Sequence, residues 1–572
     1  MKRKVFLTFF LNFVCCLAWT QITFEDRSIE LGLNLSCGYT FLGNGVSISD
    51  FNNDGWDDIT FTTELNSPLR FFENNNGIFE ERFFNFTDAM DQTKQVNWVD
   101  IDNDGDKDLF VTSNLSGNKL FENQGNYNLI EITQSSGLPT TNLGTYGASW
   151  GDYNNDGLLD VFMCNRDGGA QNPNYLFKNE GNNTFTNVSS EAGIHSENRV
   201  SFCAVFFDFN NDGWQDIYVS NDRYDYENVL YKNNGDGSFS DVSFSSKTNI
   251  ACDAMTVTVG DFNNDSWFDI YVTNSPQGNY LLLNEGDETF TDITYTSGTL
   301  FESWSWGAVW LDADNDKDLD LYVSGQYTGN DPDIRSAALY ENIGNNTFIE
   351  PIDDGFNGDD EASFSNATGD FNNDGLSDIV VTNLNTPVFA WKNESTTSHN
   401  WLKIKLQGTV SNRDGIGSTI EISENSLKQY RYVLNGEGYL SQNSAVEIFG
   451  LGTSTSVDYI KVTWLSGIEE YFYNIAANQI FEIIEGSGTL NNNVSLKNNL
   501  IIHPNPVSDR LFIENNTEFE NFVLFNALGQ EILRKNNRDF INSIDLRSFN
   551  SGVYFIRLFN EHQQLRLKII KN

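Results

Sequence analysis

Basic residues are scarce in this sequence: 34 lysines and arginines stand against 80 aspartates and glutamates, which gives a formal net charge of −46 over 572 residues. A chain with this charge repels phosphate backbones and anionic lipid surfaces. The sequence therefore excludes nucleic acid as a partner. Residues 501–572 hold nine basic and eight acidic residues, so the negative charge belongs to the chain before them.

Cysteine and histidine are also rare. Only four cysteines follow residue 20, too few for a disulfide framework in a protein of this size: Cys37, Cys164, Cys203 and Cys252. Buried free thiols are favoured over bridges, although both remain open. His195 and His399 are the only histidines before residue 500, and neither lies in a recognisable nucleophile or metal motif.

Long apolar runs are confined to the N-terminus. The first residues, MKRKVFLTFFLNFVCCLAWTQ, combine a basic start with about a dozen apolar residues and small or polar residues near Ala18 and Thr20. This pattern is typical of a secretory signal, predicted here over residues 1–20. Cys15 and Cys16 lack the small preceding residue of a lipidation site, so a lipoprotein is the minor alternative. No later run approaches the ~18–20 apolar residues of a membrane helix, and we expect no transmembrane segment.

An acidic nonapeptide recurs along the chain. DFNNDGWDD begins at Asp50, and related segments begin at Asp100, Asp152, Asp208, Asp261, Asp312 and Asp370. We call these segments acidic loops 1 to 7 and number their residues as positions 1 to 9. Near-identical segments at a spacing of about 53 residues indicate a repeat architecture.

Apolar segments flank every acidic loop. The segment that follows recurs as DITFTT, DLFVTS, DVFMCN, DIYVSN, DIYVTN, DLYVSG and DIVVTN, rich in the β-branched and aromatic residues that strands prefer. A third segment, such as NYLFKN, and a fourth, such as TFTNVS, complete four antiparallel strands per repeat. Four-stranded sheets repeated radially form a β-propeller, and seven repeats predict seven blades.

The last repeat lacks its fourth strand. The segment PVFAWKN runs directly into different sequence, whereas ITFEDRSIELGL (22–33) has the pattern of a fourth strand and precedes the first acidic loop. We therefore expect residues 22–33 to complete the seventh blade and close the ring. The predicted fold is all-β: a seven-bladed β-propeller over residues 21–395, followed by a small β domain and a C-terminal β-sandwich.

The crowding of carboxylates in these loops predicts metal binding. In the pattern D-x-[DN]-x-D-G-x-x-D, positions 1, 3, 5 and 9 can direct side-chain oxygens at one centre, and position 7 can add its backbone carbonyl. Six to eight hard oxygen ligands suit Ca²⁺ better than Mg²⁺. Without a cation the carboxylates would raise one another's pKa and destabilise the fold, and a divalent ion reverses that effect.

The predicted cofactor is Ca²⁺, up to seven ions. The predicted metal ligands are Asp50, Asn52, Asp54, Trp56 and Asp58; Asp100, Asp102, Asp104, Asp106 and Asp108; Asp152, Asn154, Asp156, Leu158 and Asp160; Asp208, Asn210, Asp212, Trp214 and Asp216; Asp261, Asn263, Asp265, Trp267 and Asp269; Asp312, Asp314, Asp316, Asp318 and Asp320; and Asp370, Asn372, Asp374, Leu376 and Asp378.

Two features qualify the metal hypothesis. Acidic turns without metal are the alternative for any one loop, but seven loops in register disfavour it. Ser266 and Lys317 replace the glycine at position 6, where a side chain strains a left-handed backbone, so these two sites are expected to be weaker.

These repeats resemble the FG-GAP or VCBS repeats of integrin-type propellers, in which cation loops lie on hairpins between strands. The resemblance covers residues 22–395 and rests on the loop, its spacing and its flanking strands. It implies that the loop metals are structural and that partners bind elsewhere on the propeller face.

Two further segments resemble known domains. NRDGIGS, GEGYLSQNS, FGLG and VDYIKVTWLSG place an ASPIC/UnbV-like domain at residues 396–485, similar to cartilage acidic protein-like proteins. A linker is predicted at 486–499. PNP, NALGQ and SGVYFI at residues 500–572 resemble the type A sorting domain of the type IX secretion system. This implies recognition by that machinery, and secretion or attachment at the outer-membrane surface of a Bacteroidetes-type bacterium.

Three functions remain open from the sequence. The favoured one is a non-catalytic, Ca²⁺-dependent module that binds an extracellular protein or glycan, for instance in adhesion. An extracellular polysaccharide lyase or hydrolase with its site on the propeller axis is the alternative, and a passive spacer is the third. Trp98, Trp150 and Trp310 could stack on sugars, although packing between blades is favoured for them. No catalytic residue is assigned.

Overall fold

The computed structural model describes residues 21–84, 91–166, 172–327, 329, 334–356, 359–490, 501–503, 507–514, 521–526, 531–536, 542–559 and 564–571. The predicted signal peptide (1–20) and residues 491–499 of the predicted linker lie outside these ranges. The chain is all-β, with 45% strand and 2% helix. It forms two compact units, one of residues up to 468 with 472–488, and one of residues 469–471 with 489–572.

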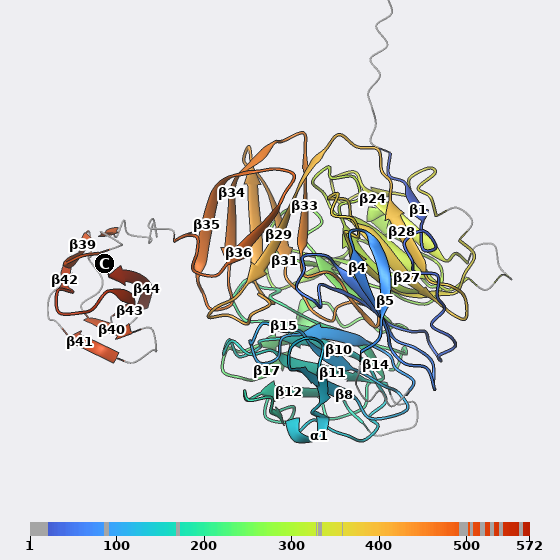
Figure 1. Cartoon of the computed structure of the whole chain (residues 1–572), viewed down its shortest axis with the longest axis horizontal. Helices are drawn as coiled ribbons and strands as arrows, with labels where there is room; N and C mark the ends of the chain where they lie inside the picture. The colour runs from blue at the N-terminus through green and yellow to red at the C-terminus, as the bar shows by residue number, and fades with distance from the viewer. Residues whose placement is uncertain are drawn as a thin grey trace, which may run out of the picture. The chain divides into compact units, whose positions relative to one another are not determined.

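The repeats form four-stranded antiparallel sheets, consistent with a propeller (Figure 1). In the third repeat β10 (Thr145–Gly151) pairs with β11 (Asp160–Asn165), β11 with β12 (Tyr175–Asn179) and β12 with β13 (Phe185–Asn187). The first two strands are buried throughout, as expected for the apolar runs that flank the acidic loop. The fourth strand buries only its first residue.

The same order recurs in the other repeats. Their first strands are β2 (Val46–Ser49), β6 (Val96–Val99), β14 (Ser201–Phe207), β18 (Val257–Gly260), β22 (Ser305–Leu311) and β26 (Ser363–Gly369). Their second strands are β3 (Asp58–Phe61), β7 (Asp108–Val111), β15 (Asp216–Asn221), β19 (Asp269–Val272), β23 (Asp320–Gly325) and β27 (Asp378–Asn383). Their third strands are β4 (Arg70–Asn75), β8 (Lys119–Asn123), β16 (Val229–Asn233), β20 (Tyr280–Asn284), β24 (Ala337–Asn342) and β28 (Phe389–Asn393). The fourth strands after repeats 1, 2, 4, 5 and 6 are β5 (Ile78–Arg82), β9 (Leu129–Glu131), β17 (Phe239–Asp241), β21 (Phe290–Asp292) and β25 (Phe348–Ile349).

The N-terminal strand completes the last repeat, as the sequence predicts. β1 (Phe24–Asp26) pairs with β28 in the sheet order β1-β28-β27-β26, with Phe24 opposite Asn393. In Figure 1 the blue β1 lies beside the yellow β28, although the two are separated by most of the chain. Three single-turn helices follow fourth strands: α1 (Thr133–Ser136), α2 (Ser243–Ser246) and α3 (Thr294–Ser297).

A segment from beyond the repeats contacts the first strand of all seven sheets. We call residues 435–444 the axial segment. It includes β32 (Ser441–Gln442), which pairs in parallel with β2. Its other contacts are Gln442 Nε2 to Trp98 O (2.9 Å), Trp150 N to Asn435 O (3.0 Å), Cys203 Sγ to Gly438 O (3.0 Å), Gly438 N to Val257 O (3.4 Å), the Tyr439 ring to the Trp306 ring (5.0 Å) and Ser444 N to Thr368 O (3.0 Å). Seven first strands therefore converge on one stretch of chain.

The axial segment belongs to a β domain packed on the repeats. Its strands are β29 (Asn400–Gln407), β30 (Thr419–Glu424), β31 (Leu427–Tyr432), β33 (Glu447–Gly452), β34 (Ser456–Thr463), β35 (Glu469–Ala476) and β36 (Ile480–Ile484). They form sheets in the orders β33-β29-β36 and β31-β30-β34-β35, drawn in orange in Figure 1. One hydrophobic cluster contains both Trp150 of β10 and Trp464 of this domain, so the two regions share a core.

The second unit contains the predicted sorting domain. Its strands are β37 (Thr489–Leu490), β38 (Ile501–His503), β39 (Arg510–Glu514), β40 (Asn521–Asn526), β41 (Glu531–Asn536), β42 (Ser543–Asp545), β43 (Gly552–Phe559) and β44 (Gln564–Lys571). They include sheets in the orders β38-β39-β42 and β41-β40-β43-β44. Leu511, Leu524 and Ile556 are among the residues of its own buried cluster.

Several smaller predictions are tested directly. The four cysteines are buried free thiols, as favoured. Trp98 and Trp150 are fully buried, and Trp310 stacks on Phe262 with ring centroids 5.8 Å apart, so packing between repeats is confirmed for these residues. Within the described ranges, no helix has the length and apolar character needed to cross a membrane.

Candidate metal centre

Each acidic loop connects the first strand of its sheet to the second, and the position-1 aspartate organises it. In loop 3, Asp152 Oδ1 accepts a hydrogen bond from Asp156 N (2.9 Å) and Oδ2 accepts one from Gly157 N (2.8 Å). The same two bonds occur in all seven loops. The local pattern of Asp and Asn therefore folds the loop tightly around its own carboxylates.

The position-9 aspartate starts the second strand and fixes the loop to the sheet. Asp160 Oδ1 accepts a hydrogen bond from Asn179 N of the third strand (2.7 Å), and Oδ2 accepts one from Tyr153 N (3.3 Å). The bond from the third-strand asparagine occurs in all seven repeats. The asparagine that ends segments such as NYLFKN is thus a structural partner of the loop. It is absent from the residues predicted from the sequence, although its recurrence in every repeat is a signal for it.

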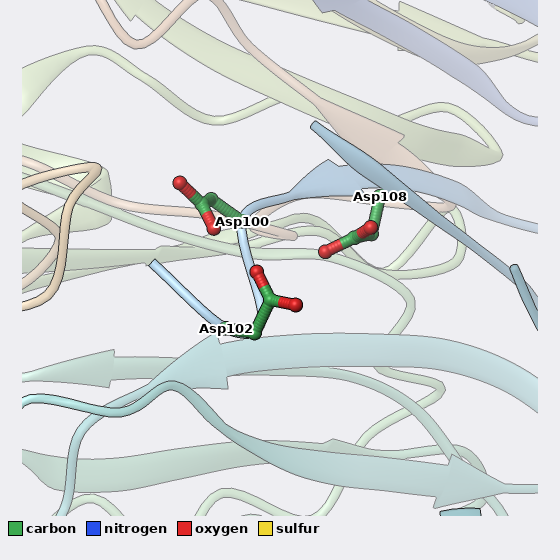
Figure 2. A group of neighbouring side chains, drawn as sticks. All are labelled: Asp100, Asp102 and Asp108. Carbon is green, nitrogen blue, oxygen red and sulfur yellow. The ribbon is translucent and has the colours of Figure 1, made fainter. Parts of the chain in front are cut away.

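In two loops the structure brings three carboxylates together. Asp100, Asp102 and Asp108 of loop 2 offer oxygens that all lie within 4.8 Å of one another, and Figure 2 shows their side chains around one common space. Asp312, Asp314 and Asp316 of loop 6 form the same kind of cluster. These are the two loops with aspartate at position 3. Hard oxygens at this spacing fit a divalent cation of the Ca²⁺ type.

The other five loops have asparagine at position 3. There the amide nitrogen donates to the position-5 carboxylate, for example Asn154 Nδ2 to Asp156 Oδ2 (3.0 Å). The side chains of positions 1, 3 and 5 are linked in each of these loops, but their convergence on one cation stays a prediction. The same holds for the backbone carbonyls predicted as ligands at position 7.

Burial raises the pKa of several buried loop aspartates, and repulsion between neighbours adds to it. The pKa of Asp108 rises to about 8, mainly because the side chain is buried, with Asp102 and Asp100 contributing repulsion. Burial likewise raises the pKa of Asp58 to about 9 and that of Asp312 to about 8. Negative charge is unfavourable in these positions without a counterion. A bound divalent cation would stabilise the ionised form of each group.

The strained backbone at position 6 is present as predicted. Five loops have glycine there with positive φ, and Ser266 and Lys317 adopt the same conformation at φ 78° and 96°. A side chain in this region adds strain of about 1 kcal/mol. The Lys317 ammonium pairs with Glu424 of the C-terminal β domain at 2.5 Å, which gives this substitution a partner.

A ring of hydrogen bonds joins the seven loops. The position-4 asparagine of each loop has φ between 54° and 62° and donates its side-chain amide to the position-6 carbonyl of the next loop. The donor and acceptor pairs are Asn53 to Gly105 (2.9 Å), Asn103 to Gly157 (2.8 Å), Asn155 to Gly213 (3.1 Å), Asn211 to Ser266 (3.1 Å), Asn264 to Lys317 (3.2 Å), Asn315 to Gly375 (3.1 Å) and Asn373 to Gly55 (3.4 Å). The last pair closes the ring, so each loop supports the next.

The C-terminal β domain places cations against these loops. Lys403 Nζ lies 3.1 Å from Asp370 Oδ2, and both side chains are almost fully buried. Lys405 Nζ lies 3.0 Å from Asp50 Oδ2. His399 is also engaged at this face, since its Nδ1 lies 2.9 Å from the backbone oxygen of Asp314. The domain therefore neutralises part of the charge of loops 1 and 7.

Comparison with known families accounts for most of the chain. The FG-GAP-like repeat family matches residues 50–111, 100–163, 152–219, 208–272 and 261–323. The ASPIC and UnbV family matches residues 408–490, and the secretion system C-terminal sorting domain matches residues 501–572. The protein thus carries FG-GAP repeats, an ASPIC/UnbV domain and a type IX sorting tail. That tail indicates secretion or outer-membrane surface localisation in Bacteroidetes.

The chain is similar to curated proteins at low identity. The chain is 25% identical over 470 residues to cartilage acidic protein 1 of Xenopus tropicalis, covering 77% of this chain and 64% of the relative. It is 22% identical to the human protein of the same name, covering 77% of this chain and 62% of that protein. The chain therefore spans somewhat less than two thirds of these relatives. A chain of the Photorhabdus luminescens Tc holotoxin pore aligns with 94% of this chain and 24% of its own length at 11% identity, and its TM-score of 0.31 supports no inference.

Proposed function

We propose that this protein is a Ca²⁺-binding, seven-bladed propeller, secreted or held at the cell surface, that binds an extracellular protein or glycan without catalysing a reaction. The observation that carries the proposal is the uniform geometry of the acidic loops. All seven fold their position-1 aspartate around the same backbone N–H groups. A repeated, oxygen-rich geometry of this kind suits a set of structural cations.

Two features support a closed ring of seven blades. The hydrogen bonds of the position-4 asparagines return from loop 7 to loop 1 through Asn373 and Gly55. The axial segment contacts the first strand of every sheet, as expected if those strands surround it. In the same way, we propose that the two sheets of the sorting domain pack as a β-sandwich around their shared cluster.

The residues present fit Ca²⁺. Carboxylates at positions 1, 5 and 9, with aspartate or asparagine at position 3, would hold each ion, and the position-7 carbonyl would complete the set. Bound Ca²⁺ would supply positive charge where burial now raises the pKa of the carboxylates. Seven ions would offset about 14 units of the negative charge, at about two units each. The expected role is to stabilise the ring.

The enzyme alternative places a catalytic site on the axis, and in the proposed ring the axial segment would fill that position. Tyr439 is fully buried there among Phe202 and Trp306. The two histidines of the repeat and ASPIC/UnbV regions have structural contacts: His195 Nε2 lies 2.8 Å from Asp241 Oδ2, and His399 meets the backbone of loop 6. These observations favour a binding module over axial chemistry.

Ligand arrays test this function. The mature full-length protein, labelled and loaded with Ca²⁺, is applied to glycan and extracellular-protein arrays, and the same arrays are repeated after chelation. We expect saturable binding that is lost on chelation, because the ring that presents the surface depends on the ions. Binding that chelation leaves intact would contradict the Ca²⁺ dependence. No binding on either array would favour the passive spacer, and turnover of an arrayed polysaccharide would favour the enzyme.

A further inference from the structure

A cleft of about 590 Å³ opens at the end of the sheets opposite the acidic loops. It is lined by residues between β1 and β2, by the β3–β4 connection, by the end of β5 and by Asn385 of the β27–β28 connection. The acidic loops join first strands to second strands, whereas these connections follow second strands, so the two sites lie at opposite ends of the sheet. The volume is within the range of small-molecule sites, about 300–1,000 Å³.

The cleft exists because the first and last repeats meet. Ser36 forms a β-bridge with Pro387, and Asn385 N donates to Gly38 O (3.4 Å). The pairing of β1 with β28 brings these segments together from opposite ends of the repeat region. The C-terminal β domain contacts acidic loops at the other end, through Lys403 and Lys405, and contributes none of the described residues that line the cleft.

The lining combines polar groups with the apolar Cys37, Pro68 and Phe83, of which the Phe83 ring is the largest. It offers the Glu64 and Glu81 carboxylates, the Arg70 guanidinium, the Asn385 amide and the hydroxyl groups of Ser36, Thr63 and Ser67. Phe83 stands at the edge with 83% of its surface exposed. Large aliphatic side chains are lacking among the described residues that line the cleft, so it has no deep apolar pocket for a protein's anchor residue.

The polar groups are held in place. Glu64 Oε2 accepts a hydrogen bond from Tyr39 N (2.9 Å), and Arg70 pairs with Glu81. Gly38 has φ +78°, and a Cβ there would lie 2.3 Å from Glu64 Cδ, so glycine is what lets the carboxylate pack at this point. Such preorganisation reduces the entropy lost on binding a ligand.

The chemistry of the lining selects the ligand. Two carboxylates and one guanidinium carry a net charge of −1, and the whole chain carries −46, so an acidic or sulfated ligand is repelled. Paired carboxylate, guanidinium and amide groups can accept from and donate to several hydroxyls at once. An aromatic face beside them can cover the C–H face of a sugar ring.

We propose that this cleft binds a neutral oligosaccharide, with a sugar ring over Phe83 and sugar hydroxyls hydrogen-bonded to Glu64, Glu81, Arg70 and Asn385. The proposal rests on the binding function proposed above and identifies its surface and ligand class. It does not include chemistry on the sugar. The Cys37 thiol in the floor is buried, and burial raises the pKa of that thiol to about 12, so it is not a nucleophile there.

The test compares two variants of the cleft with a matched control. Phe83→Ala removes the exposed ring, and Asn385→Gly removes the amide while tolerating the positive φ of 63°. Phe244→Ala is the control, because Phe244 is 86% exposed on α2 of another repeat. Full-length mature proteins in Ca²⁺ are titrated by calorimetry with neutral gluco-, xylo-, manno- and chito-oligosaccharides and with acidic oligogalacturonate. Unchanged melting temperatures verify that each variant is folded.

We expect at least one neutral oligosaccharide to bind, with a Kd at least tenfold weaker for Phe83→Ala and for Asn385→Gly and unchanged for Phe244→Ala. Neutral-sugar binding that survives both cleft variants overturns the assignment of the site. Preference for the acidic oligosaccharide overturns the ligand class. If no sugar binds but a protein ligand is captured on the arrays, the cleft proposal fails and the binding function stands. Absence of any ligand in both experiments overturns both.

Discussion

Removing one proposed metal ligand from an exposed loop position should separate metal binding from folding. Asp104, at position 5 of loop 2, is exposed, and its only side-chain bond among the described residues is from Asp106 N to Oδ1 (2.9 Å). Asp104→Ala should therefore change the Ca²⁺-free protein little, since the lost hydrogen bond of about 1 kcal/mol is partly offset by relief of repulsion with its neighbours. In Ca²⁺ the variant is also expected to lose one ligand of the proposed ion.

The expected shift in melting temperature follows from the thermodynamic linkage between ion binding and folding. At a hundredfold excess over Kd, a bound ion adds about 2.7 kcal/mol to the free energy of unfolding. The region of repeats and ASPIC/UnbV domain should unfold with an entropy of about 1 kcal/mol per K, at ~2 cal/mol/K per residue, so one ion raises the melting temperature by about 3 °C. Asp104→Ala should lower the Ca²⁺-induced increase by that amount, and seven ions together account for about 19 °C if their effects add.

Tryptophan fluorescence during heating measures this shift with and without Ca²⁺. Asp236→Ala is the matched control, because Asp236 is an exposed aspartate outside the acidic loops whose Oδ1 likewise accepts a backbone bond, from Ser238 N (3.1 Å). The control should retain the full Ca²⁺-induced increase. The reasoning is refuted if both variants keep the wild-type increase, or if Asp104→Ala lowers the melting temperature equally in both conditions.

Three further changes have defined outcomes in the same melting assay. Lys403→Met leaves the buried Asp370 carboxylate unpaired and should destabilise the Ca²⁺-free protein by about 3 kcal/mol, with a smaller loss in Ca²⁺; equal losses would count against a cation at that loop. Ser266→Gly relieves the backbone strain of a side chain at φ 78° and should raise the melting temperature by about 1 °C. A decrease would show that the serine side chain stabilises the fold. Burial raises the pKa of Glu437 from 4.5 to about 7. The contribution of Glu437 to the free energy of unfolding is therefore complete below pH 4.5. It is lost as pH rises through about 7, by about 1.4 kcal/mol per pH unit. Glu437→Gln should flatten the stability profile between pH 4.5 and 7, and an unchanged slope would contradict this assignment.

The repeat made much of the fold predictable. Strand-forming segments on both sides of each acidic loop, and the missing fourth strand after Trp391, sufficed to predict the pairing of residues 22–33 with the last repeat. These features are local and recur seven times, so a single sequence carries its own internal comparison. The other five loops have glycine at position 6, which predicted a left-handed backbone at Ser266 and Lys317 in the remaining two loops.

Contacts between distant segments were not predictable in this way. Tyr439 belongs to a loop of the ASPIC/UnbV domain, and nothing in its local sequence indicates that it packs against Phe202 and Trp306 of the repeats. The ring of position-4 asparagines was within reach, because asparagine occupies that position in every loop, but the turn preference of asparagine was a sufficient local explanation. The hydrogen bond from this asparagine side chain to the next loop becomes visible only when neighbouring loops are placed side by side.

The central claim is that Ca²⁺ occupies the acidic loops of the folded protein. The most direct measurement is the number of Ca²⁺ ions per chain, determined by elemental mass spectrometry after equilibrium dialysis of the mature protein against millimolar CaCl₂, with free metal subtracted. We expect a value near seven for the wild-type protein and near six for Asp104→Ala. A value near zero for the folded wild-type protein, or one that Asp104→Ala leaves unchanged, would contradict it.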